Sequence, residues 1–88
     1  MWLVKLGDLR ARARIQARID RLALGNPGDA KPVGQGVFEM RIDYGPGYRV
    51  YYVRRGAVVV VLLCGGHKAS QARDIERAQD MAKQLKER

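Results

Sequence analysis

Apolar side chains recur between residues 9 and 24 with the spacing of an α-helix. The intervals of 4, 4 and 3 residues place them on one face of that helix: Ala11, Ile15, Ile19 and Leu22. Asp8 can begin the helix as its N-cap, and Gly25 can end it as its C-cap. The sequence therefore predicts one amphipathic helix over this range.

Two other segments have helical character. Trp2, Leu3 and Leu6 resemble the end of a helix that stops at Gly7, so a helical hairpin is predicted at the start of the chain. Near the other end, Ser70 can cap a helix that extends through Lys86, with a weakly apolar face and many charges elsewhere.

The middle of the chain has the alternation of β-strands. Residues 38–43 and 48–54 alternate between apolar and polar side chains, and Gly45–Pro46–Gly47 forms a turn between them. Residues 57–64 are apolar on both faces, which is typical of a strand in the middle of a sheet. The sequence predicts an α+β fold: a helical hairpin, a small antiparallel meander and a C-terminal helix, forming one domain over residues 1–88.

Charge narrows the choice of partner. The chain has 17 Lys and Arg against 9 Asp and Glu, a formal net charge of +8, while its hydrophobic fraction of 47% is that of a globular protein. A basic domain of this kind binds nucleic acid or an acidic protein surface. Four of the arginines lie on one stripe of the first predicted helix, beside its apolar face: Arg10, Arg14, Arg18 and Arg21.

Cysteine and histidine content excludes several kinds of site. Cys64 is the only cysteine and His67 the only histidine, so no intrachain disulfide, thiolate zinc site or histidine metal cluster is expected. The longest apolar run, residues 57–64, is far shorter than the ~18 residues of a membrane span. Residues 1–6 are too short for a signal-peptide core. We expect a cytoplasmic protein that uses no metal or cofactor.

The polar face of the predicted meander has the groups needed to handle a phosphate. Arg41 and Arg49 fall on adjacent strands, and Lys68 follows the third. Cleavage of RNA by its own 2′-hydroxyl needs cations that stabilise the phosphorane, together with proton transfers. Tyr51 shares this face and adds an aromatic ring on which a base could stack.

Each of these features also has a purely structural interpretation. Arg41 and Arg49 are also explained as solvated strand charges paired with Glu39 or Asp43, and His67 as a surface loop histidine. The tyrosines are more typical of sheet packing, and the arginine stripe is more typical of a solvated helix face.

Several sequence blocks resemble a known family. The most specific are GPGYRVYY at residues 45–52 and LLCGG-x-K at residues 62–68; others are RIQARIDRL at 14–22 and GNPGD at 25–29. From about residue 2 to residue 80 the chain resembles the addiction module killer proteins, a HigB-like branch of the RelE/ParE toxin superfamily. The resemblance implies a small antiparallel sheet flanked by helices, and the toxin of a type II toxin–antitoxin pair.

The resemblance also implies roles for residues. RelE-like toxins cleave mRNA in the ribosomal decoding site, and Arg49 and Lys68 match positions of their catalytic cations. Arg41 falls near one of two lysines of the preceding strand, but Glu39 takes the place of the other lysine. Asp74 stands where RelE-like toxins have a catalytic tyrosine, so His67 becomes the candidate for proton transfer.

We therefore expect a metal-independent, ribosome-dependent endoribonuclease that blocks translation. Its catalytic candidates are Arg41, Arg49, His67 and Lys68, and its RNA-binding candidates are Lys31, Tyr51 and Arg54. The alternatives are a ParE-like gyrase poison and an inactive relative that only binds an antitoxin.

The resemblance also implies binding partners. They are a cognate helix-turn-helix antitoxin, the ribosome with its mRNA, and operator DNA reached only through the antitoxin. Related toxins begin with a β-strand that is missing from this sequence. Either the sheet has an unpaired edge, which a partner could fill, or the native start lies upstream of Met1.

Overall fold

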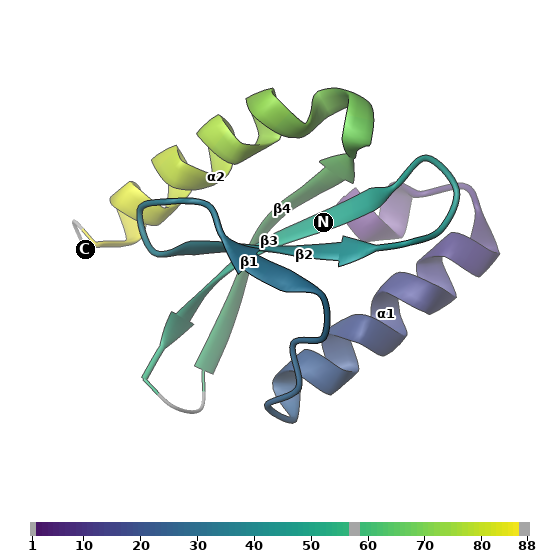
Figure 1. Cartoon of the computed structure of the whole chain (residues 1–88), viewed down its shortest axis with the longest axis horizontal. Coiled ribbons are helices and arrows are strands. Elements are labelled where there is room, and N and C mark those ends of the chain that lie inside the picture. Colours follow the sequence, from purple (N-terminus) through teal and green to yellow (C-terminus); the bar gives the residue numbers. More distant parts are fainter. Residues whose placement is uncertain (1, 57–58, 87–88) are drawn as a thin grey trace.

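The protein is an α+β fold in which two helices cover opposite faces of a four-stranded antiparallel sheet (Figure 1). The computed structural model describes residues 2–56 and 59–86. In chain order its elements are η1 (Trp2–Lys5), α1 (Leu9–Ala23), β1 (Ala30–Pro32), β2 (Val37–Ile42), β3 (Tyr48–Arg55), β4 (Val59–His67), η2 (Lys68–Ser70) and α2 (Gln71–Lys86). Within this described part, no helix is long and apolar enough to cross a membrane.

Helix α1 confirms the prediction from its apolar spacing. The Asp8 carboxylate accepts hydrogen bonds from the backbone N–H groups of Arg10 and Ala11, as an N-cap does. Gly25 follows the end of the helix with φ +93°, a conformation that glycine adopts without steric cost. The helix thus begins and ends within one residue of the predicted bounds.

The prediction of a helical hairpin at the start of the chain was wrong. Trp2–Lys5 is a single 3-10 turn, so α1 is the one α-helix that precedes the sheet among the described residues. Four residues cannot supply the hydrogen bonds that offset helix nucleation. The turn is held by packing instead, since the Trp2 ring lies against Tyr48 with a centroid distance of 6.0 Å.

The sheet has strand order β1-β2-β3-β4, one strand more than predicted. The additional strand, β1, has three residues and ends at Pro32, too short and irregular for an alternation pattern to show it. Strand β4 lies at an edge, so its predicted central position was wrong; residues 57–58 of that prediction lie outside the described residues. Its apolarity on both faces reflects helices on both sides of the sheet, not strands on both of its edges.

The two faces of the sheet have separate cores. Met40, Val50 and Tyr52 pack toward α1, while Val37 and Tyr51 pack toward Ala78 and Ala82 of α2. Alternate side chains of β2 and β3 point to opposite faces, as predicted, and pairing sets Arg41 opposite Arg49. The polar residues of the α2 face therefore gather where β2 ends and β3 begins.

Candidate functional site

Three of the predicted catalytic cations line one pocket. The pocket has a volume of about 300 Å³ and lies at the junction of β2, β3 and η2. It is lined by Asp29, Arg41, Ile42, Asp43, Gly47, Tyr48, Arg49 and Lys68. The pairing of β2 with β3 supplies the two arginines, and Lys68 enters because η2 begins directly after β4. Hence residues far apart in the sequence present three positive charges to one hollow.

A fully buried carboxylate, Glu39, lies beneath these cations. Its Oε1 accepts a hydrogen bond from Arg41 Nε at 3.0 Å, and the Arg49 Nη1 atom lies 3.9 Å away. Its Oε2 accepts from the Tyr51 hydroxyl and from Gln71 Nε2, each at 3.0 Å. The carboxylate thus links two strands and α2, and it holds the arginines from below.

Hydrogen bonding keeps this carboxylate ionised. Burial raises the pKa of Glu39, but the hydrogen bonds from Gln71, Arg41 and Tyr51 and the charge of Arg49 outweigh it, so its pKa lies below the ordinary value. The pKa of Tyr51 is raised by burial and by its hydrogen bond to Glu39. At neutral pH Tyr51 is therefore a donor and Glu39 an acceptor, and the hydrogen bond between them is stable.

Arg49 has hydrogen-bonding capacity that the described residues do not use. Its side chain is nine-tenths buried, yet Nε and Nη1 have no hydrogen-bond partner among residues 2–56 and 59–86. Buried donors without partners cost free energy, and a guanidinium group at a pocket wall is suited to bind the oxygens of a phosphate. Arg49 therefore has the chemistry to bind an anion.

Other predicted site residues lie elsewhere. His67 pairs with Tyr48, so it lies on the α1 side of the sheet, whereas Arg49 pairs with Gly66; His67 is exposed and does not line the pocket. Arg54 is exposed and lies about 17 Å along β3 from Arg49, at 3.4 Å per residue. The structure therefore does not bring these two residues to the site.

Lys31 and Tyr51 lie near Glu39 in different positions. The Lys31 side chain is half exposed, with its Nζ 4.0 Å from Glu39 Oε1, and so remains available to a ligand. Tyr51 is fully buried, so its ring cannot stack on a base and instead supports the site through Glu39.

Two supporting residues were not assigned to the site from the sequence. Glu39 was expected as a charge partner of Arg41 and Arg49, which the structure confirms, and as a departure from the family pattern, whereas Gln71 was not singled out at all. The signal for Glu39 was its position on the polar face of an alternating strand, opposite Tyr51 across β2 and β3. No such signal marks Gln71, because its hydrogen bond to Glu39 depends on how α2 lies on the sheet.

The lowered pKa of Glu39 predicts a contribution to acid sensitivity. Its stabilising effect is complete above the unfolded-state pKa of about 4.5 and is lost as the pH falls through the lower folded-state pKa. Urea unfolding of the wild type and of Glu39→Gln between pH 2.5 and 7 measures this. The wild type should lose more stability on acidification than Glu39→Gln. If the free energies of unfolding of the two proteins fell in parallel with pH, the lowered pKa of Glu39 would be contradicted.

One comparison with known proteins identifies a family. The model of the family described as phage derived protein Gp49-like (DUF891) matches residues 1–87. A protein of Haemophilus influenzae, described as uncharacterized, is 55% identical over 84 residues, which cover 96% of this chain and 85% of that protein. No solved structure gives a significant match. Because the family model spans almost the whole chain, this protein belongs to the Gp49-like family of phage-derived proteins.

Proposed function

We propose that this protein is the toxin of a type II toxin–antitoxin pair and cleaves mRNA on the ribosome. The observation that carries the proposal is the pocket that Arg41, Arg49 and Lys68 share, with donors on the buried Arg49 that have no hydrogen-bond partner in the described part of the chain. The sequence blocks that resemble HigB-like toxins support it, because their cation positions fall on Arg49 and Lys68. Membership of the Gp49-like family is compatible with this function.

The pocket suits attack of a ribose 2′-oxygen on the adjacent phosphorus. The O2′–P bond forms, the P–O5′ bond breaks, and the products are a 2′,3′-cyclic phosphate and a 5′-hydroxyl. Arg49 and Lys68 would bind the non-bridging oxygens, whose negative charge grows in the phosphorane, and Arg41 would assist. The ion pair with Glu39 would help to orient the Arg49 guanidinium group toward the pocket.

We assign proton transfer to groups other than the predicted histidine. His67 lies on the α1 side of the sheet, whereas the carboxylates that line the pocket are Asp29 and Asp43. One of these would accept the 2′-hydroxyl proton, and water or the same acid would return a proton to O5′.

Induced expression in bacteria tests the proposal, with 5′ ends mapped on a translated reporter mRNA. The wild type should produce new ends within codons only when the message is translated. Arg49→Ala should reduce this cleavage at least 100-fold, since loss of one oxyanion donor costs about 10²–10³ in rate. The matched control is Arg77→Ala, an exposed arginine of α2 outside the pocket, which should cleave like the wild type.

Other outcomes would favour the alternatives. Growth arrest with intact message and a DNA-damage response would indicate a gyrase poison. Absence of arrest, with an antitoxin still bound, would indicate an inactive relative. On our proposal a helix-turn-helix antitoxin with an acidic surface covers the basic pocket in the resting cell, and operator DNA is bound only through that antitoxin.

A further inference from the structure

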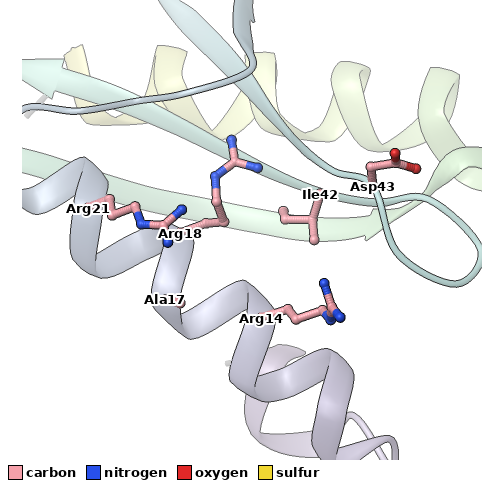
Figure 2. Close-up of a pocket in the computed structure, with 6 residues that line it drawn as sticks. All are labelled: Arg14, Ala17, Arg18, Arg21, Ile42 and Asp43. Atoms are coloured by element: carbon pink, nitrogen blue, oxygen red, sulfur yellow. The ribbon is translucent and has the colours of Figure 1, made fainter.

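A second basic hollow lies between α1 and the end of β2. Its volume is about 280 Å³, and its lining is Arg14, Ala17, Arg18, Arg21, Ile42 and Asp43 (Figure 2). Three guanidinium groups and one carboxylate therefore face one space. We call this hollow the arginine groove.

The three arginines of the groove are held differently. Arg18 reaches from α1 to the sheet and donates to the carbonyl oxygens of Arg41 at 2.7 Å and Pro27 at 3.2 Å. Figure 2 shows Arg14 and Arg21 on either side of it. Both are exposed, and the Arg14 guanidinium lies 4.6 Å from the centre of the Tyr44 ring. Arg18 thus fixes the helix against the strand, while Arg14 and Arg21 keep donors for a ligand.

The arginine groove adjoins the candidate catalytic pocket. Ile42 and Asp43 line both hollows, so the two meet where β2 ends. The connection is also structural, because the carbonyl oxygen that binds Arg18 belongs to Arg41, whose side chain lines the catalytic pocket. A polymer held in one hollow can therefore continue past Asp43 into the other.

We propose that the arginine groove binds backbone phosphates of the single-stranded RNA that occupies the catalytic pocket. This inference rests on the proposed function. Arg14 and Arg21 lie about 10 Å apart along the helix axis, at 1.5 Å per residue, so they can contact different phosphates. Arginine beside an aromatic ring is typical of sites for single strands, and guanidinium groups bind phosphate through paired N–H donors. Continuity with the pocket favours RNA over an acidic protein as the occupant.

The test measures binding of a fluorescently labelled 2′-O-methyl RNA 12-mer to the full chain by anisotropy across a salt series. This RNA lacks the 2′-hydroxyl and cannot be cleaved. For Arg14→Gln/Arg21→Gln, the slope of log K against log salt should be smaller than wild type by about 1.4, at about 0.7 per lost phosphate contact. Arg73→Gln/Arg77→Gln removes the same charge from exposed positions of α2 and should leave the slope unchanged.

Two results would overturn the groove proposal. One is an equal change of slope in both double variants, which would show an effect of net charge alone. The other is an unchanged slope for Arg14→Gln/Arg21→Gln; if this variant also loses antitoxin binding, the groove is a protein interface. Arg14→Lys/Arg21→Lys should recover most of the slope, and urea unfolding followed by Trp2 fluorescence shows that each variant is folded.

The reporter experiment separates this proposal from the one on which it rests. If Arg49→Ala abolishes mRNA cleavage and the slope is unaffected by Arg14→Gln/Arg21→Gln, only the groove fails. If Arg49→Ala still cleaves mRNA while the slope falls as expected, the catalytic assignment fails and the groove remains an RNA site.

Discussion

Replacing Glu39 with leucine is expected to lower the free energy of unfolding by about 3–5 kcal/mol, the cost of removing one partner from a buried ion pair. Arg49 would remain nine-tenths buried without the carboxylate near it, and the hydroxyl of the buried Tyr51 would lose its acceptor. Urea unfolding at pH 7, followed by the fluorescence of the single tryptophan, Trp2, measures the loss.

A second variant distinguishes an uncompensated charge from simple misfit of the leucine. Glu39→Leu/Arg49→Met replaces both partners with apolar side chains and should recover much of the stability, since buried ion pairs can often be exchanged for apolar groups at little cost. If the free energy of unfolding of Glu39→Leu lay within 1 kcal/mol of the wild-type value, this would show that Glu39 does not stabilise Arg49. The double variant should nevertheless remain inactive, because it lacks the phosphate-binding guanidinium.

Substitution of Gly66 or Gly65 with alanine is also expected to lower the free energy of unfolding. A methyl group on Gly66 would overlap the buried Asp74 carboxylate, and one on Gly65 would overlap the Trp2 ring. Overpacking of this kind costs about 1–3 kcal/mol, because side chains and backbone must move to relieve it. Lys68 follows two residues after Gly66, so its position in the pocket should be disturbed as well.

The two glycine variants should differ in their fluorescence. Gly65→Ala should shift the Trp2 emission to longer wavelength as the ring is displaced toward water, whereas Gly66→Ala should leave the emission nearly unchanged. Gly7→Ala is the matched control, because a methyl group there has no neighbour within 4 Å. If Gly65→Ala were as stable as Gly7→Ala, the contact between Trp2 and β4 would be wrong.

Local patterns were sufficient for much of the fold. Helix α1 and its cap followed from the spacing of apolar residues after Asp8, and the faces of β2 and β3 followed from alternation. The short elements were not predictable in this way. Strand β1 has too few residues to show a period, and its pairing with β2 depends on the loop that returns the chain to the sheet.

The candidate site shows the same division. Arg41 and Arg49 could be placed together because two alternating segments joined by a tight turn must pair. The face of His67 could not be predicted, because Tyr51 pairs with Cys64 while Tyr52 pairs with Leu62. This bulge leaves one additional residue in β4, which reverses the alternation beyond it. A bulge of this kind leaves no periodic pattern in the sequence from which it could be predicted.

The edge position of β4 has a consequence for the behaviour of the protein in solution. Nine residues, many of them apolar, present one row of backbone donors and acceptors with no neighbouring strand in the described part of the chain. Such an edge invites self-association. Mutual repulsion between molecules of charge +8 opposes it, and that repulsion weakens as added salt shortens the Debye length. We therefore expect association through the β4 edge to increase with ionic strength, so that the colloidal stability of this protein depends on salt.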